Sequence, residues 1–532
     1  MALPATIRRR KSMVVRMSDH PTSALADLRS AAGDHGLSDD AALLALVSHD
    51  VFSRGATPLA VLKPDSFEAL AAGIAAAARH GLAIVPRGGG MSYTGGYLAD
   101  SPGAVLVDTS RLDRVVEIDQ GNMTVTVEAG ITWKALHEQL SPLGLRVRSW
   151  GTLSGINATV GGGMSQNGTF WGSGSGALAD SAIAFDVVLA DGTIMSTGHS
   201  KFRAFGPDLT GLFCGDCGAL GVKARATLRL VRIGAGKAYG SIAFPDAATF
   251  FAGMGAIARE GLASECFGFD PFLQAQRMKR DSLASDAKSL ITMMRSQGSF
   301  LKGLVEGTKV ALAGRGFLDD VPFSLHCITE RRTQDAADSD MREILRIAAQ
   351  AGGKPVENTI PKVLRANPFP PVNSMVGPAG ERWVPVHGFI ANDRLGECWA
   401  AICALFEEHA ELMARERIEW GALLAAVSPQ CSLIEPVFYW PDALNPLHRA
   451  AVEKAHMARL SPGGENPAAT EAVKLLRADL VALFRRFDAA HVQVARTYPL
   501  EASHDPAAWA LLKAVKQQLD PDNRMNPGAL GL

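Results

Sequence analysis

Hydrophobic positions in the first 230 residues form short β-branched runs that alternate with longer segments of helical spacing. Helices are expected at residues 66–80 and 133–140, and a helical stretch at 23–46 contains an N-cap candidate at Asp39 or Asp40. Apolar runs bounded by turn residues predict strands at residues 59–62, 83–86, 105–108, 115–118, 124–127 and 184–189. This order predicts a domain of mixed helices and strands.

A second pattern covers residues 240–490, where helical stretches separate the strand candidates. Strands with helices on one face predict an antiparallel α+β domain. Residues 277–316 do not follow this alternation of strands and helices and are expected to form an insertion or lid of unknown role. The strand candidates lie at residues 241–244, 322–328, 383–389 and 418–427.

These patterns divide the chain into four expected parts. Residues 1–50 hold a disordered tail, from residue 1 to about residue 20, and a helix, and residues 51–235 form the first domain. Residues 236–490 form the second domain, and residues 491–532 are a C-terminal segment with a helix at 507–519. A chain of 532 residues favours at least two domains. The expected fold class is α+β.

Charge and composition narrow the classes of function. The chain has 53 Lys plus Arg against 54 Asp plus Glu and no sustained basic stripe, which argues against a nucleic acid partner. No apolar run approaches the about 18 residues of a membrane span, and the apolar stretch near Met1 is too short for a signal peptide. Seven scattered cysteines favour reduced thiols, so we expect a cytoplasmic protein.

The strongest chemical signal is a glycine loop at residues 85–96, which reads Val-Pro-Arg-Gly-Gly-Gly-Met-Ser-Tyr-Thr-Gly-Gly and follows a predicted strand. Without Cβ atoms, such a backbone can turn successive N–H groups toward one anion, as in a pyrophosphate nest. A tight structural turn is the competing interpretation. The spacing matches neither Gly-x-Gly-x-x-Gly nor Gly-x-x-x-x-Gly-Lys-Ser/Thr, which disfavours Rossmann and P-loop folds.

Two further glycine loops follow at residues 150–168 and 211–222, and the sequence Leu-Asp-Pro-Asp-Asn-Arg-Met-Asn-Pro-Gly occupies residues 519–528. Three loops in this order are hard to explain as turns. Their order and spacing resemble the FAD-binding domain of the vanillyl-alcohol oxidase/p-cresol methylhydroxylase (PCMH) superfamily. The motif at 519–528 resembles the C-terminal signature of that superfamily.

The resemblance implies a PCMH-type FAD-binding domain of two subdomains, and a cap domain whose antiparallel sheet is covered by helices. It implies FAD as cofactor, with the pyrophosphate on the amides of residues 87–92 and the isoalloxazine at the domain boundary. In such a dehydrogenase or oxidase, FAD accepts a hydride and protein groups orient the substrate. The implied cofactor-binding residues are Pro86, Arg87, Gly88, Gly89, Gly90, Met91, Ser92, Trp150, Gly151, Thr152, Thr159, Gly161, Gly162, Asn167, Gly168, Gly221, Val222 and Asn526.

Within this superfamily, the branch that oxidises para-substituted phenols uses two tyrosines, an arginine and an aspartate near flavin N5. Arg496 matches the arginine, but Ala495 and Ala177 stand at the places of a tyrosine and the aspartate. Tyr93 or Tyr439 could replace the missing tyrosine from another direction. The expected donor is therefore an aromatic or para-substituted phenolic alcohol, oxidised at a CH–OH or benzylic CH position.

The branch that oxidises 2-hydroxy acids such as lactate or glycolate is the alternative, and only His387-Gly388 resembles part of its cap motif. Both branches need an anion partner and a base. The expected catalytic residues are Arg496 for the anion and His387 for the proton, with Tyr439 as the compensating tyrosine. An ion-pair role for Arg496 and a satisfied core position for His387 are competing interpretations. A flavoprotein without turnover, serving as an electron-transfer subunit or binding module, is a third class.

The flavin is expected to be non-covalent. A histidine after the first glycine triplet often tethers FAD in this superfamily, and Met91 stands there. The tether of the phenol branch would fall near Cys431-Ser432, which offers no histidine either. No metal is expected, because the pair Cys214 and Cys217 supplies only two of four zinc ligands. The expected partner is a small aromatic or carboxylated substrate; the electron acceptor (oxygen, a cytochrome or another) and a homo-oligomer are left open.

Overall fold

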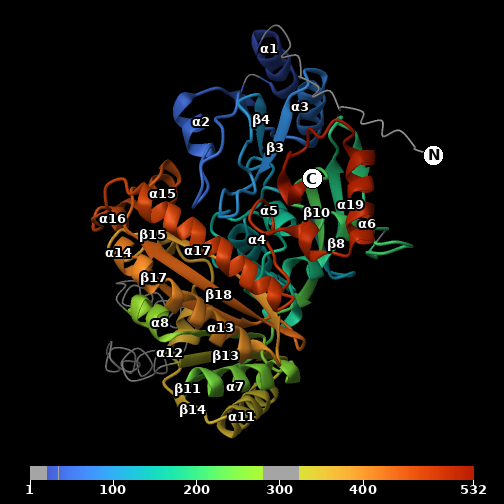
Figure 1. Ribbon diagram of the computed structural model, residues 1–532. Helices are drawn as coiled ribbons and strands as arrows, with labels where there is room; N and C mark the ends of the chain where they lie inside the picture. Colours follow the sequence, from blue (N-terminus) through green and yellow to red (C-terminus); the bar gives the residue numbers. More distant parts are fainter. Residues whose placement is uncertain (1–20, 34, 200, 279–322) are drawn as a thin grey trace, which may run out of the picture.

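The computed structural model describes residues 21–33, 35–199, 201–278 and 323–532. The tail expected at 1–20 and most of the insertion expected at 277–316 lie outside these residues. Three sheets organise the described chain. Figure 1 shows the first two, in blue to green, at one end of the molecule and the third, in green to orange, at the other.

The first sheet has the strand order β1-β2-β4-β3, and β2, β4 and β3 run parallel. Helix α3 begins after Ser66, whose hydroxyl accepts a hydrogen bond from the Ala69 N–H at 3.2 Å. The stretch expected to be helical at 23–46 is two helices, because residues 37–38 between them pair with β2, and Asp40 caps the second. The elements are α1 (Pro21–Ala32), β1 (Leu37–Ser38), α2 (Ala41–Val47), β2 (Ala60–Leu62), α3 (Phe67–Arg79), β3 (Ala83–Arg87) and β4 (Ala104–Asp108).

The second sheet is antiparallel, with the order β5-β6-β10-β8-β9 and with β7 paired to the end of β10. The strand expected at 184–189 is β8, which turns into β9 through Asp191 and Gly192. Trp133 of α4 lies fully in its core. The elements are β5 (Val115–Asp119), β6 (Thr124–Glu128), α4 (Trp133–Leu140), β7 (Leu145–Val147), α5 (Val160–Gln166), β8 (Ala182–Val188), β9 (Ile194–Ser196), α6 (Leu209–Leu212) and β10 (Val222–Arg232).

The third sheet is antiparallel with the order β14-β11-β13-β12-β17-β18-β15, and β16 also pairs with β18. This confirms the expected α+β class. The strand expected at 383–389 is two strands, because β15 and β16 pair with separate halves of β18 and leave Val386 and His387 between them. The strands are β11 (Gly236–Phe244), β12 (Glu265–Phe269), β13 (Phe323–Arg331), β14 (Lys354–Val356), β15 (Arg382–Pro385), β16 (Gly388–Ala391), β17 (Glu419–Ala426) and β18 (Cys431–Trp440).

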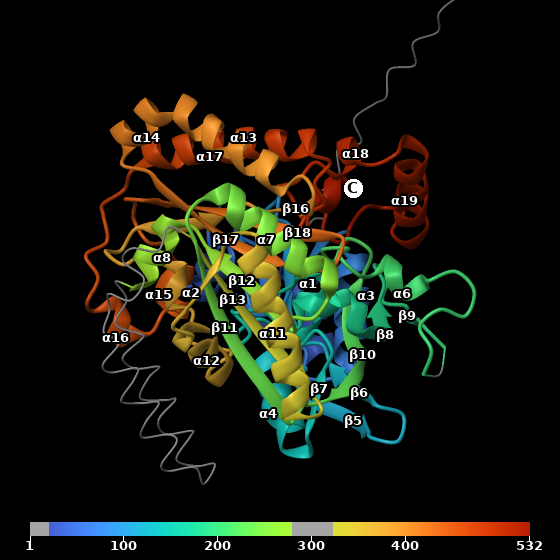
Figure 2. The ribbon, with the colours of Figure 1, turned by 90° about the horizontal axis from the view of Figure 1, so that it is seen from below.

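Helices cover one face of the third sheet and bury a continuous apolar core against it. Figure 2 shows α13 and α17 side by side along this layer, with α7 and α11 continuing it. The opposite face turns toward the second sheet, with which it shares a second apolar cluster. The helices of this region are α7 (Ala247–Glu260), α8 (Pro271–Met278), α11 (Gln334–Gln350), α12 (Thr359–Ala366), α13 (Leu395–Glu408), α14 (Ala410–Glu416), α15 (Pro446–Ala451), α16 (Lys454–Met457) and α17 (Pro467–Arg486).

The end of the chain returns to the first two sheets. Helices α18 (Leu500–Ser503) and α19 (Pro506–Leu519) follow α17, and α19 lies beside the second sheet in Figure 1. Met525 forms a parallel bridge with Ile84 of β3. The Asn526 side-chain amide donates to the carbonyls of Gly96 and Cys217, at 2.9 and 2.7 Å. The C-terminal motif therefore ties the first and third glycine loops together.

Candidate active site

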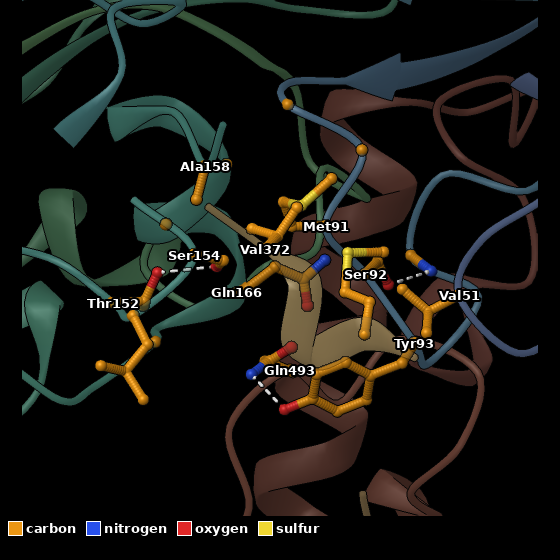
Figure 3. Close-up of a pocket in the computed structure, with 18 of the residues that line it drawn as sticks. Val51, Met91, Ser92, Tyr93, Thr152, Ser154, Ala158, Gln166, Val372 and Gln493 are labelled. Atoms are coloured by element: carbon orange, nitrogen blue, oxygen red, sulfur yellow. Dashed lines mark hydrogen bonds between the residues drawn. The ribbon is translucent and has the colours of Figure 1, made fainter. Parts of the chain in front are cut away.

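One cavity of about 660 Å³ runs between the first two sheets and the free face of the third sheet. All three glycine loops contribute to its wall, together with side chains from β15 to β18. Figure 3 shows part of this wall, with Met91, Ser92 and Tyr93 of the first loop facing Gln166 and Gln493. We call the part lined by residues 86–92 of the first glycine loop the glycine end. The part lined by Tyr93 and by strands β15–β18 is called the cap end.

The glycine end presents a row of backbone amides. Within the described chain, no hydrogen-bond acceptor lies on the N–H groups of residues 88–93. The loop can approach its neighbours this closely only without side chains: a Cβ on Gly89 would collide with the Asn157 carbonyl, and one on Gly88 with the Thr159 hydroxyl. Gly90 has φ +74°, in the region that favours glycine. Consecutive free amides of this kind form an anion nest.

Arg87 adds a cation beside this nest. Its guanidinium lies 3.4 Å from the Asp108 carboxylate and 5.2 Å from the Tyr97 ring centre. Its Nε is buried without a partner in the described chain. A charge with one unused donor at the edge of an amide nest suits a phosphate group.

The second and third loops complete the glycine end. Thr159 caps α5 through a bond from the Gly162 N–H at 3.2 Å, and a Cβ on Gly161 would collide with Ala129. Lys223 lines the cavity, and its amine bonds Asp216 at 2.6 Å and Ser165 at 2.7 Å. The residues present therefore fit a long anionic cofactor such as FAD, with the nest and Arg87 at its pyrophosphate.

Most of the cofactor-binding residues predicted from the sequence lie in the cavity wall. Trp150, Gly151, Asn167 and Asn526 are not among the lining residues. Trp150 is buried between the rings of His137 and Trp171, at 4.8 and 5.0 Å, and Asn167 caps the end of α5, so these two hold the loops in place. Those in the wall are Pro86, Arg87, Gly88, Gly89, Gly90, Met91, Ser92, Thr152, Thr159, Gly161, Gly162, Gly168, Gly221 and Val222.

The cap end is apolar and aromatic. Strand β18 places alternate side chains there, because successive residues of a strand point to opposite faces. Of the described residues that line this end, Glu435 is the one with a carboxyl group. The lining residues are Tyr93, Trp383, His387, Phe389, Leu423, Leu433, Glu435, Val437, Tyr439, Val492 and Gln493.

Sequence reasoning missed Glu435 and β18 as a whole. A signal was available, because Cys431–Trp440 is an apolar run interrupted by one carboxylate. Leu433, Val437 and Tyr439 lie on the same face of β18 as Glu435. A single charge at a buried-face position of a strand is expensive unless it has a partner or a function.

Tyr93 is the polar centre of the cap end. Its hydroxyl accepts a hydrogen bond from the Gln493 side-chain amide at 2.8 Å and lies 3.4 Å from a Glu435 carboxylate oxygen; Figure 3 shows the first of these bonds. Burial is the main cause that raises the pKa of Tyr93 well above its ordinary value, and Glu435 adds to the rise. Tyr93 is therefore a protonated hydrogen-bond donor at neutral pH.

His387 lines the cap end, as predicted, but both ring nitrogens are engaged. Nε2 donates to the Val492 carbonyl at 2.8 Å, and Nδ1 lies 3.3 Å from the Tyr498 hydroxyl. Burial lowers the pKa of His387 to about 3. This neutral, doubly bonded imidazole is a poor proton acceptor, so the geometry speaks against the predicted role as base and for the competing interpretation of a satisfied core histidine.

Arg496 does not lie in the cavity wall. Its guanidinium donates to the carbonyls of Gly95 and Pro527, both at 2.6 Å, and lies 3.2 Å from Asp100 and from the Asn526 side chain. Arg496 thereby links Gly95 of the first glycine loop to residues 526–527 of the C-terminal segment. The geometry speaks against the predicted substrate-anion role and for an ion-pair role. Tyr439 does line the cap end.

Metal-binding clusters and membrane-spanning helices are two further features that bear on function. Within the described ranges, no group of three or more His, Cys, Asp and Glu side chains is placed to hold a metal ion. The Cys214 thiol donates to the Thr210 carbonyl, and the Cys217 thiol to the Gly215 carbonyl and the Gln166 side-chain oxygen. In the same ranges, no helix has the length and apolarity that crossing a bilayer requires.

Two parts of this chain match families of FAD-dependent proteins. Residues 58–198 match the FAD binding domain family, and residues 494–530 match the C-terminal domain of FAD linked oxidases. A probable mitochondrial D-lactate dehydrogenase of Danio rerio is 33% identical over 219 residues, 39% of this chain and 42% of that protein. The glycolate oxidase subunit GlcD of Bacillus subtilis is 32% identical over 189 residues, 34% of this chain and 40% of that protein. The chain thus matches about two fifths of the length of these curated relatives.

The whole fold has solved counterparts. The structure of p-cresol methylhydroxylase with substrate bound superimposes with a TM-score of 0.70 at 15% identity, over 96% of each chain. At this identity the likeness concerns the fold. The chain thus carries the FAD binding domain and the C-terminal domain of FAD linked oxidases, on the fold of the vanillyl-alcohol oxidase/p-cresol methylhydroxylase superfamily, with FAD as its cofactor.

Proposed function

We propose that this protein oxidises an uncharged aromatic or para-substituted phenolic alcohol at the cap end of the cavity. The observation that supports this most directly is the make-up of that end, where aromatic and aliphatic walls surround the Tyr93 hydroxyl and the Glu435 carboxylate. A tyrosine donor and a carboxylate acceptor 3.4 Å apart suit a ligand hydroxyl, which can accept from one and donate to the other.

Bound FAD supplies the hydride acceptor for such an oxidation. The chain's own residues have three other tasks. Trp383, Phe389 and Tyr439 would hold an aromatic ring by apolar and edge contacts. Tyr93 would orient the hydroxyl, and the surrounding walls would exclude water, which strengthens each polar contact.

Oxidation of a 2-hydroxy acid is the second candidate function. Its support is the likeness to a D-lactate dehydrogenase and to a glycolate oxidase subunit. A carboxylate substrate calls for a cation within reach. The described side chains that line the cap end include no lysine or arginine, and a carboxylate beside Glu435 would be repelled. The aromatic candidate is therefore preferred.

Anaerobic bleaching of the flavin separates the candidates. The purified protein is mixed, without oxygen, with 4-alkylphenols, benzylic alcohols, D-lactate or glycolate, and its oxidised-flavin absorbance is followed. We expect bleaching by an aromatic alcohol or phenol and none by the two acids. Bleaching by the acids alone would favour the second candidate. A flavin that no compound bleaches would favour a protein without turnover.

We also infer a reducing location such as the cytoplasm, because all seven cysteines are free thiols. The named D-lactate dehydrogenase relative is mitochondrial. Microscopy of a fluorescent fusion tests the inference, and an organelle pattern would contradict it.

A further inference from the structure

Glu435 places a carboxyl group in the largely apolar and aromatic wall of the cap end. Glu435 sits on β18 between Leu433 and Val437, which share its face of the strand. Its cross-strand neighbour on β17 is Leu423. A carboxylate on an apolar face costs folding free energy unless it has partners or serves the reaction. Here it faces the cavity and the hydroxyl of Tyr93, which is 342 residues away in the chain.

The neighbouring groups fix the direction of the Tyr93 proton. Gln493 Nε2 donates to the Tyr93 hydroxyl oxygen at 2.8 Å, so the Tyr93 proton points elsewhere, toward Glu435 or toward a ligand oxygen. Gln493 is itself held, because its backbone N–H donates to the Gln166 carbonyl at 2.7 Å. The Arg477 guanidinium donates to the Tyr93 carbonyl at 3.2 Å. Tyr93 and its orienting amide therefore form a rigid donor beside a carboxylate.

The other titratable groups around the cap end are poorer proton acceptors. His387 has both ring nitrogens engaged. Tyr498 accepts from the His387 N–H at 2.9 Å, and burial raises its pKa. Arg477 is a cation whose Nε is buried. Glu435 is the one carboxylate among the described residues that line the cap end.

We propose that Glu435 is the catalytic base of the reaction, accepting the hydroxyl proton of the substrate while Tyr93, positioned by Gln493, donates a hydrogen bond to the same oxygen. This rests on the proposed function. In an alcohol, the O–H bond breaks and its proton passes to a Glu435 oxygen. The C–H bond breaks and its electron pair leaves with hydrogen as hydride to oxidised FAD, and a carbonyl forms. In a para-alkylphenol, the phenolic O–H proton passes to Glu435, the benzylic C–H bond breaks with its electron pair leaving as hydride to oxidised FAD, and the ring becomes a quinone methide.

Glu435→Gln is the central test, because it keeps the shape and removes the base. We expect unchanged FAD content, substrate binding within a few-fold, and anaerobic flavin reduction slowed by roughly 10²–10⁴-fold. In the wild type, the reduction rate should fall at acid pH as the base becomes protonated, and this acid limb should vanish in the variant. Glu419→Gln is the matched control, since Glu419 is exposed on the adjacent strand β17.

Two further variants keep the test decisive. Glu435→Asp retains a carboxylate, so its reduction rate should lie between those of the wild type and Glu435→Gln, with the acid limb kept. Gln493→Leu should slow reduction less than Glu435→Gln, because it only releases the Tyr93 hydroxyl. If Glu435→Gln loses FAD, Glu435→Asp is compared with the wild type instead. A Glu435→Asp variant that reduces its flavin at the wild-type rate, with no acid limb in either protein, would overturn the proposal.

Failure of this inference is distinct from failure of the proposed function. A wild-type flavin bleached by an aromatic alcohol, together with an equally fast Glu435→Gln variant of the same pH profile, would refute the base and leave the function standing. A wild-type flavin that no hydroxylated aromatic compound bleaches would refute the function itself.

Discussion

At the residue scale, backbone groups supply the clearest part of the candidate cofactor site. Residues 88–93 offer six consecutive N–H groups without an acceptor in the described chain. The side chains nearby are largely occupied with holding loops, as Arg496 and Asn526 do. Cofactor affinity should therefore depend on glycine more than on any charged residue.

Gly89→Leu tests this dependence. The new side chain would collide with the Asn157 carbonyl, so the two loops must move apart and the amide nest should open. We expect the purified variant to carry much less FAD per chain than the wild type, measured as the ratio of flavin to protein absorbance. Gly396→Leu is the control, because a Cβ at Gly396 meets no atom within 4 Å. Full FAD content in a folded Gly89→Leu variant would remove this loop from the site.

Met91 leads to the expectation that FAD is bound non-covalently. It lines the cavity directly after the glycine triplet, and its thioether is no tether for a flavin. Precipitating the protein with acid should leave the yellow colour in the supernatant, as FAD. Colour retained in the pellet after repeated washing would show a covalent bond and contradict the prediction.

At the scale of elements, caps and strand alternation explain why the elements lie where the apolar pattern places them. Helix α3 follows the predicted span closely because Ser66 caps it and a glycine follows its end. Strand β18 was missed although it is long, since its residues are nearly all apolar and lack an alternating polar signal. Both its faces are covered, one by helices and one by the cavity wall.

Ser66→Ala tests the cap of α3. The change removes the acceptor of the Ala69 N–H, so the free energy of unfolding should fall by about 1 kcal/mol. Urea titration followed by circular dichroism measures this change. Ser101→Ala, in an exposed turn, should leave the midpoint unchanged. An equal midpoint for Ser66→Ala and the wild type would argue that the helix is held by packing alone.

At the scale of the whole molecule, a buried ion cluster joins the second and third sheets. Arg146 of β7 lies 3.2 Å from Glu330 of β13, and Arg365 of α12 also contacts that carboxylate. The two arginines lower the pKa of Glu330 against the opposing effect of its burial. Arg365 also lies over the Trp150 ring, at 4.5 Å. The cluster thus fixes the third sheet relative to the second glycine loop.

Glu330→Ala should destabilise the whole protein. Arg146 would keep its buried charge without a carboxylate partner, and Arg365 would retain only Glu265, at 3.7 Å. Breaking a buried pair in this way costs about 3–5 kcal/mol. Thermal unfolding should show a lower midpoint together with earlier release of FAD fluorescence. Glu343→Ala, an exposed pair partner of Arg346 on α11, should unfold like the wild type. A Glu330→Ala midpoint within error of the control would show that the two sheets are held by apolar contacts alone.

The sequence by itself determined the local features of this protein. Glycine-rich loops, helix caps and short β-branched strands depend on neighbours in the chain, so the three loops, α3, α4 and α19 could be predicted from local spacing. The resemblance carried by those loops also predicted FAD and the α+β class, both of which are confirmed.

Only the tertiary structure decided which side chains reach the cavity. Glu435 meets Tyr93 because the fold brings β18 next to the first glycine loop. The place of β18 depends in turn on the pairing of the eight strands of the third sheet. His387 and Arg496 have types suited to catalysis, yet their nitrogens are engaged by Val492, Gly95 and Pro527. The type of a residue is written in the sequence, whereas its freedom to meet a substrate depends on partners brought from distant parts of the chain.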